Sequence, residues 1–368
     1  MKVLVTGAEG FIAKNLIVSL QRQENVEIIR YSKSATLADL ELGVQQADFI
    51  FHLAGVNRPK NEGEFTSGNT ELTQLICKLV KSSGQNKPIL FSSSIQVESD
   101  NAYGKSKLIA ETHLITLHNE TGNLVYIYRL PNVFGKWCKP NYNSVVATFC
   151  HNIANDLPIQ IHNSDTQLEL VHIGAVVTSF LDVLYKQPSD SIFIKVAPVY
   201  LATLGELADM LYKFKQSRKT LITEPVGNGF SRVLYATYIS YITPSNFNYS
   251  LEKHEDARGI FVEMLKTQNS GQFSFFTAHP GITRGGHYHQ CKTEKFLVIK
   301  GVARFKFRHI ITDEICEILV SGDNPEIVET IPGWSHDITN IGEDELIVML
   351  WANENFDNER PDTVAFRV

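Results

Sequence analysis

Tyr103 and Lys107 lie four residues apart in a segment whose pattern predicts a long helix. Side chains at this spacing share one helix face, and a nearby ammonium lowers the pKa of a tyrosine toward neutrality. Tyr103 could then protonate a carbonyl oxygen while hydride arrives. Ser94 ends an upstream serine run and could donate a hydrogen bond to the same oxygen. We predict carbonyl reduction with Ser94, Tyr103 and Lys107 as catalytic residues, although the choice within Ser92–Ser94 stays open.

A glycine loop connects the first predicted strand, Lys2–Thr6, to the first predicted helix. Gly7 permits a tight turn, and Gly10 lets the backbone approach a pyrophosphate. The helix N-terminus at Phe11 and Ile12 would face this anion. We expect a dinucleotide here, although such a glycine pair by itself also fits an ordinary strand-to-helix turn.

The end of the second predicted strand indicates which dinucleotide binds. Sites specific for NAD usually place an acidic residue there against the ribose hydroxyls, whereas this chain has Arg30, Ser32 and Lys33. We expect these three residues to hold the 2′-phosphate of NADPH, with Tyr103 and Lys107 also contacting the cofactor. The alternative is that the two cations are ordinary solvated loop residues.

Three histidines and a glutamate near the C-terminal end form a second chemical pattern. Alternate residues of a strand point the same way, so His287 and His289 would face one side. Glu294 and His336 could complete the set from neighbouring strands. Such a set suits zinc, iron, manganese or nickel, and we favour Zn²⁺ as a Lewis acid that polarises a carbonyl. Histidines with purely structural partners are the alternative.

Two regions with different sequence patterns must position these residues. Up to about residue 243, short apolar runs alternate with helical segments, which predicts an α/β Rossmann-type domain with a parallel sheet. From about residue 250 to 368, short β-type runs are separated by glycine and proline, which is typical of an antiparallel sandwich or barrel. We therefore predict domains at 1–243 and 250–368.

The composition excludes several classes of protein. A net charge of −6 over 368 residues gives no general attraction to nucleic acid or to an anionic membrane surface. No run of 18 apolar residues occurs, so we expect no membrane insertion. Five cysteines without a Cys-x-x-Cys pair do not suit a disulfide framework, and a cytoplasmic location is expected.

The region up to about residue 241 resembles the extended short-chain dehydrogenase/reductase family, and within it enzymes that act on nucleotide sugars. The resemblance implies that Leu53, Ala54 and Gly55 lie along the cofactor and that Asn132 lies near the sugar nucleotide. Ser94 and Tyr103 are only nine residues apart, whereas this family usually has more than twenty. The matching residues are the Gly7/Gly10 loop, His52–Gly55, Asn69, Ser92–Ser94, Tyr103, Lys107 and Arg129–Gly135.

The remaining third resembles the cupin family, whose fold is an all-β jelly roll. The segment Gly281–Gly301 matches the first cupin motif completely, whereas in Pro332–His336 the proline and glycine of the second motif are adjacent. The segment 256–263 resembles the opening of cupin-fold 4-keto-sugar epimerases, which remove a proton beside a ketone and replace it from the other face. Arg258 and Arg284 would bind phosphate, unless they are ordinary surface arginines. The base stays open among His279, Tyr288, Lys292 and a metal-bound water.

A reductase followed by a zinc cupin resembles bifunctional enzymes of capsular polysaccharide synthesis across essentially the whole chain. The resemblance implies C3 epimerisation of UDP-2-acetamido-2,6-dideoxy-L-arabino-hexos-4-ulose. NADPH then reduces C4 to give UDP-2-acetamido-2,6-dideoxy-L-talose, a precursor of UDP-N-acetyl-L-fucosamine. One alternative is a reductase whose cupin is only a structural or dimerisation module, and another is a non-catalytic NADP sensor. A homodimer is expected in each case, because cupin domains often pair through sheet edges.

Overall fold

The computed structural model describes the chain except for residues 60, 62, 187–191, 252–253, 257–258, 262–264, 268–270 and 355–358. The chain forms two compact units. The first contains residues 1–144 and 168–201, and the second contains residues 145–167 and 202–368.

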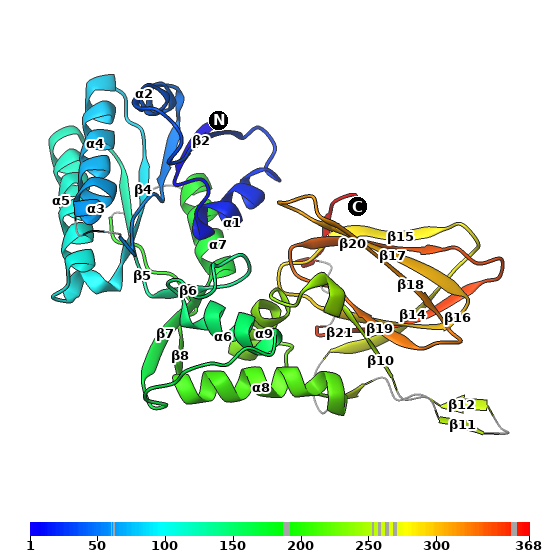
Figure 1. Ribbon diagram of the computed structural model, residues 1–368. Helices are drawn as coiled ribbons and strands as arrows, with labels where there is room; N and C mark the ends of the chain where they lie inside the picture. Colours follow the sequence, from blue (N-terminus) through cyan, green and yellow to red (C-terminus); the bar gives the residue numbers. More distant parts are fainter. Residues whose placement is uncertain are drawn as a thin grey trace. The chain divides into compact units, whose positions relative to one another are not determined.

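The first unit is built on a parallel sheet of five strands in the order β2-β1-β3-β4-β5 (Figure 1). Successive residues of β1 face opposite sides, so Val3 and Val5 enter one hydrophobic core and Leu4 enters the other. Helices cover both faces, which explains why the strands read as continuous apolar runs. The strands are β1 (Lys2–Thr6), β2 (Glu27–Tyr31), β3 (Phe49–His52), β4 (Ile89–Ser94) and β5 (Val125–Leu130).

Two groups of helices form the outer layers of this unit, and the predicted α/β Rossmann-type architecture is confirmed. Helices α1 (Phe11–Leu20) and α7 (Ile173–Tyr185) pack on one face. Helices α2 (Leu37–Gln46), α4 (Leu72–Ser83) and α5 (Ala102–Thr121) pack on the other. Three short helical segments complete the unit: α3 (Gly63–Phe65), η1 (Thr66–Glu71) and η2 (Ile95–Glu98). A further sheet of the chain contains β6 (Asn132–Phe134), β7 (Gln167–His172) and β8 (Tyr200–Thr203).

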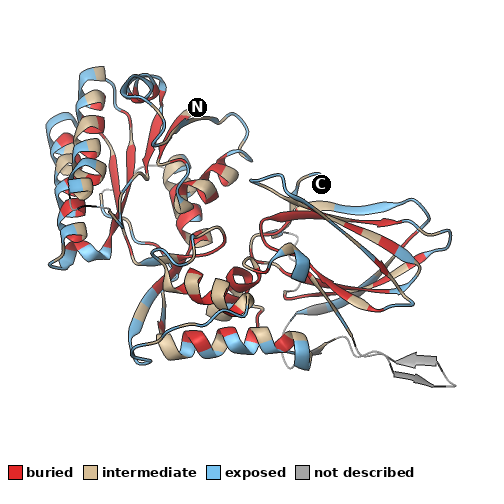
Figure 2. Cartoon of the chain, viewed as in Figure 1, coloured by how far each residue is buried: buried red, intermediate tan, exposed pale blue. Residues whose placement is uncertain are grey.

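The second unit contains an antiparallel sandwich, as expected for a cupin jelly roll. One sheet has the order β10-β19-β16-β21-β14 and the other β18-β17-β20-β15-β22. Strands of both sheets contain buried residues (Figure 2), and Phe296 of one sheet contacts Phe305 of the other (ring centroids 5.6 Å apart). The strands are β10 (Asn248–Ser250), β14 (Gln272–Ala278), β15 (Thr283–Tyr288), β16 (Glu294–Lys300), β17 (Val302–His309), β18 (Ile315–Ser321), β19 (Glu326–Glu329), β20 (Trp334–Asn340), β21 (Leu346–Ala352) and β22 (Val364–Ala365).

Helices α6 (Val145–Ala154), α8 (Leu204–Thr220) and α9 (Gly229–Ile239) pack on one another and belong to the same unit as the sandwich. Arg218 of α8 pairs with Glu329 (Nε–Oε2, 3.5 Å), and Asn353 donates to the carbonyl of Val226 (3.2 Å). These packing units do not divide at residues 243–250, and the domain ranges 1–243 and 250–368 stay predictions. The other short elements are β9 (Ile222–Thr223), η3 (Pro244–Asn246), β11 (His254–Asp256), β12 (Gly259–Phe261) and β13 (Lys266–Thr267).

Within the described ranges, the helices are too short or too polar for any of them to cross a membrane.

Candidate active site and metal centre

The glycine loop lies where the carboxyl ends of β1, β2 and β3 meet. Gly7 has a φ of +65°, and a Cβ built on it would lie 2.7 Å from the Cα of Ala54. Only glycine therefore lets the loop approach the segment Leu53–Gly55 so closely. Gly10 is the N-cap of α1 and has no side chain to cap the helix, so the first N–H groups, including those of Phe11 and Ile12, remain suited to an anion.

The residues expected at the 2′-phosphate lie beside this loop, because the amide of Ala8 donates to the carbonyl of Tyr31 (3.1 Å). Arg30 and Lys33 are exposed. The hydroxyl of Ser32 is hydrogen-bonded to that of Ser34 (2.9 Å). The backbone therefore brings the end of β2 beside the glycine loop, and the role of these three side chains at the cofactor stays a prediction.

Tyr103 is positioned by the capped start of α5. Asn101 accepts a hydrogen bond from the amide of Gly104 (2.8 Å). A Cβ at Gly104 would lie 2.0 Å from the carbonyl oxygen of Gln96, so this glycine lets α5 start directly against η2. Burial raises the pKa of Tyr103, and a hydrogen bond with the Ser94 side chain opposes that rise. The expectation that Lys107 lowers this pKa is wrong here, because burial dominates and the ammonium is engaged elsewhere.

The ammonium of Lys107 is buried and donates to the carbonyl of Ser92 (2.9 Å). It also lies 4.6 Å from the ring centroid of Phe91. Burial lowers the pKa of Lys107 to about 8, although the charge of Glu111 opposes this effect. A Cβ at Gly55 would lie 3.0 Å from this ammonium, so Gly55 leaves the room that Lys107 occupies.

The three serines at the end of β4 have different partners. Ser93 donates to Glu111 (Oγ–Oε1, 2.5 Å), and that carboxylate also binds Arg129 (Oε2–Nη2, 2.7 Å). Ser92 offers its carbonyl to Lys107, whereas the Ser94 side chain is hydrogen-bonded to Tyr103. This geometry favours Ser94 over its neighbours. Sequence analysis missed Glu111, although its position four residues after Lys107 on the same helix face was a usable signal.

Two polar residues support the same region. Asn69 is buried and holds both the amide (2.8 Å) and the carbonyl (2.9 Å) of Val56. Its amide group also donates to the hydroxyl of Ser106 on α5 (2.9 Å). Asn132 lies on β6, where it is exposed and donates to the carbonyl of Glu169 (3.1 Å).

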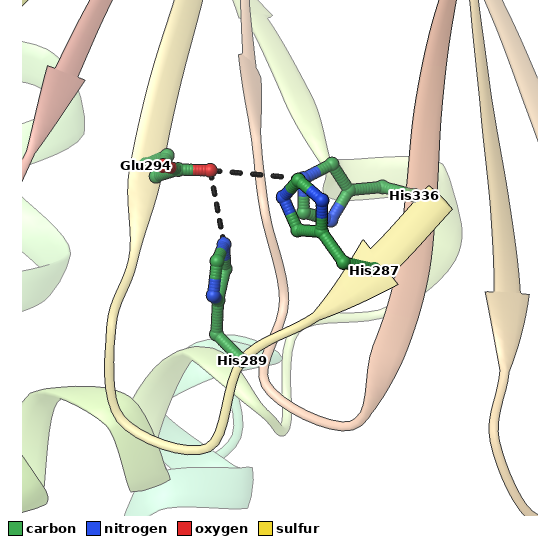
Figure 3. Close-up of side chains that lie close together, drawn as sticks. All are labelled: His287, His289, Glu294 and His336. Atoms are coloured by element: carbon green, nitrogen blue, oxygen red, sulfur yellow. Dashed lines mark hydrogen bonds and ion pairs between the residues drawn. The ribbon is translucent and has the colours of Figure 1, made fainter. Parts of the chain in front are cut away.

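The predicted metal ligands converge inside the sandwich (Figure 3). Each of the four side chains offers a ligand atom, and these atoms all lie within 4.8 Å of one another. His287 on β15 is paired in register with His336 on β20, and His289 follows β15 directly. Glu294 begins β16, and its Oε2 lies 3.1 Å from Nε2 of His289 and 3.6 Å from Nε2 of His336.

The electrostatics of this cluster suit a cation. Burial lowers the pKa of His287 to about 4 and also lowers the pKa of His336. Burial would raise the pKa of Glu294, but hydrogen bonds from His289 and His336 hold it well below its usual range. Nδ1 of His336 is buried and has no hydrogen-bond partner among the described residues. Neutral imidazoles with an ionised carboxylate are the donor set that Zn²⁺ and related metals bind.

The three side chains considered as the base have different surroundings. The ammonium of Lys292 is 2.7 Å from Oε1 of Glu294, so it contacts a predicted ligand directly. Tyr288 is buried with its ring near that of Phe366 (centroids 6.1 Å apart), and His279 is exposed.

Of the two arginines expected at phosphate, Arg284 lies within the described residues. Arg284 is exposed and donates to the carbonyl of Thr277 (2.8 Å), with its guanidinium 5.2 Å from the ring centroid of Phe276. Arg258 lies outside the described residues. Their phosphate-binding role stays a prediction.

Models of two known protein families match separate parts of the chain. The model of the NAD dependent epimerase/dehydratase family matches residues 3–194, and the model of the polysaccharide biosynthesis C-terminal domain matches residues 254–364. The chain therefore belongs to the NAD dependent epimerase/dehydratase family, in a two-domain group that its full-length relatives define.

Two of these relatives match the whole length of the chain. UDP-2-acetamido-2,6-beta-L-arabino-hexul-4-ose reductase of Pseudomonas aeruginosa is 55% identical over 368 residues, which is 100% of this chain and 99% of that protein. The crystal structure of the capsular polysaccharide assembling protein CapF from Staphylococcus aureus is 42% identical, with a TM-score of 0.70 and full coverage of both chains. UDP-glucuronic acid 4-epimerase from Bacillus cereus, at 19% identity and a TM-score of 0.52, covers 58% of this chain and 83% of its own, and shows the fold alone.

Proposed function

We propose that this chain is an NADPH-dependent reductase of a UDP-linked 4-keto-6-deoxy amino sugar, and that its cupin domain first epimerises C3. The observation that carries the reductase is the contact between the Ser94 and Tyr103 side chains, on the unit that holds the glycine loop. The name of the P. aeruginosa relative supports UDP-2-acetamido-2,6-dideoxy-L-arabino-hexos-4-ulose as the substrate. The product would be UDP-2-acetamido-2,6-dideoxy-L-talose, on the way to UDP-N-acetyl-L-fucosamine for capsular polysaccharide.

In the reduction, Tyr103 gives its phenolic proton to the C4 oxygen, while the Ser94 hydroxyl donates a hydrogen bond to that oxygen. The buried ammonium of Lys107, which donates to the Ser92 carbonyl, would support the reduction by holding the cofactor beside the serine strand. Asn132 would contact the sugar nucleotide. NADPH supplies the hydride when bound, and it would be held by Gly7, Gly10, Phe11, Ile12, Arg30, Ser32, Lys33, Leu53, Ala54, Gly55, Tyr103 and Lys107.

In the epimerisation, Zn²⁺ would be held by His287, His289, Glu294 and His336, and would polarise the C4 carbonyl when bound. The proton on C3 is acidic only while C4 is a ketone, and reduction of C4 removes that acidity. Epimerisation must therefore precede reduction, and one 4-keto sugar serves both sites.

A single incubation in D₂O tests the proposal. Purified protein, NADPH and the UDP-linked 4-keto sugar are mixed, and the product is analysed by NMR and mass spectrometry. Deuterium at C3 together with NADPH consumption is the expected result. Reduced product without deuterium would leave a reductase whose cupin is a structural or dimerisation module. Deuterium without NADPH oxidation would indicate an epimerase whose nucleotide domain only binds.

A further inference from the structure

The short loop between His289 and Glu294 is bound by Asp362, a residue near the far end of the chain, as well as by Asn353, which accepts from the amide of Thr293 (3.0 Å) and donates to the carbonyl of Cys291 (3.2 Å). Asp362 accepts hydrogen bonds from three successive backbone amides: Gln290 to Oδ1 (2.8 Å), and Cys291 (2.6 Å) and Lys292 (2.7 Å) to Oδ2. A carboxylate has only acceptor sites, so it can satisfy three converging N–H donors.

The backbone of Asp362 acts on a predicted ligand itself. Its carbonyl oxygen lies 2.5 Å from Nδ1 of His289. A carbonyl only accepts, so Nδ1 carries a proton, and a bound metal would replace the proton through which Nε2 is hydrogen-bonded to Glu294. Nε2 is the nitrogen that faces Glu294.

The segment that follows Asp362 contacts the two strands that carry His287 and His336, β15 and β20. Strand β22 pairs with β15, with Ala365 opposite His287. The amide of Phe366 donates to the carbonyl of Gly286 (2.8 Å), and its carbonyl accepts from the hydroxyl of Ser335, next to His336.

A cation from α9 completes the arrangement. Nη2 of Arg232 lies 2.6 Å from Oε2 of Glu354 and 3.6 Å from Oδ2 of Asp362. The side chain of Asp362 is only 14% exposed. The carboxylate of Asp362 therefore contacts both Arg232 and the amides of the loop between His289 and Glu294.

We propose that Asp362 is a positioning residue of the metal centre, whose carboxylate shapes the loop between His289 and Glu294 while its carbonyl aims Nε2 of His289 at the metal. The inference rests on the metal site of the proposed function. A purely structural role, in which Asp362 only anchors the C-terminal segment, is the competing explanation.

The test compares Zn²⁺ binding by the full-length wild type, Asp362→Asn and a matched control, Asp313→Asn. Asp313 is an exposed aspartate of the same sandwich that pairs with Arg308 (Oδ1–Nη2, 2.6 Å). The amide introduced by Asp362→Asn would keep one acceptor oxygen but turn an NH₂ group toward a backbone N–H. We expect Zn²⁺ affinity in a chelator competition to fall about 10- to 100-fold in Asp362→Asn and to stay unchanged in Asp313→Asn. The visible spectrum of the Co²⁺-loaded protein should change only in Asp362→Asn.

Thermal unfolding separates positioning from structure. A metal stabilises the folded state in proportion to the logarithm of its affinity, so a positioning role predicts a smaller Zn²⁺-induced rise in Tm for Asp362→Asn. A lower Tm with an unchanged rise, or an unchanged affinity and Co²⁺ spectrum, would overturn the proposal.

Two further measurements keep the proposal testable if Asp362→Asn does not fold. Amide exchange in the metal-free wild type should already be slow at residues 290–292, and protection that arises only with Zn²⁺ would overturn the inference. The metal site itself is tested by His336→Ala: Zn²⁺ binding that survives this variant, or no binding by the wild type, would refute the site and the inference together. Normal wild-type binding with an unaffected Asp362→Asn would refute the inference alone.

Discussion

Replacing Lys107 by methionine should stabilise the folded protein at pH 7 while it removes reductase activity. Burial lowers the pKa of Lys107 from 10.5 to about 8, and Glu111 only partly opposes this. One pKa unit corresponds to about 1.4 kcal/mol, so the buried charge costs the folded state about 3 kcal/mol. Methionine removes this cost but also loses the hydrogen bond to the Ser92 carbonyl, which contributes about 1–2 kcal/mol. The expected net gain at pH 7 is about 1–2 kcal/mol.

The stability advantage of Lys107→Met over the wild type should fall as the pH rises. Between pH 8 and 10.5 the unfolded state binds more protons at Lys107 than the folded state does, so wild-type stability from this group rises with pH. The Lys107→Met variant lacks that contribution, and its advantage should disappear by about pH 10. All other titrating groups are shared, and their effects cancel in the difference between the two proteins.

Urea unfolding of both proteins, followed by circular dichroism at several values between about pH 7 and 10, measures this difference. Reductase turnover is measured in parallel and should fall at least about 100-fold. A stability difference that stays constant with pH would refute the reasoning, because it would mean that the ammonium of Lys107 is not destabilised by burial.

Four further predictions follow from the same geometry. Ser94→Ala should lower kcat about 100-fold, whereas Ser93→Ala should mainly lower stability, because Ser93 donates to a buried carboxylate. Turnover and urea unfolding of the two variants distinguish these effects. Equal losses of turnover would contradict the assignment of Ser94. Removal of metal with a chelator should abolish deuterium incorporation at C3 and leave NADPH affinity, measured by fluorescence, unchanged. The double variant Arg30→Ala and Lys33→Ala should raise KM for NADPH at least about tenfold while KM for NADH changes little; a parallel rise would show that no 2′-phosphate is held there. Light scattering checks whether the protein is the expected homodimer. If the two copies pair through edge strand β14, Phe275→Asp on that strand should shift the protein toward monomer, because Phe275 is 72% exposed.

Local spacing was enough to predict much of the fold and the candidate sites. The period of apolar residues separates the parallel α/β part from the antiparallel part, because helices and strands bury different positions. The same arithmetic placed Tyr103 beside Lys107 on one helix face. Period-two spacing put His287 and His289 on one side, and the structure brings them to Glu294 and His336.

Only the tertiary structure decided which groups control these side chains. The pKa of Tyr103 is raised rather than lowered because burial outweighs every other effect on it, and burial depends on contacts from several elements. Asp362 meets Gln290 across 72 positions in the chain, a distance over which no periodic pattern operates. Sequence spacing therefore determines which side chains share a face, whereas desolvation and hydrogen bonds between distant segments determine their charge and orientation.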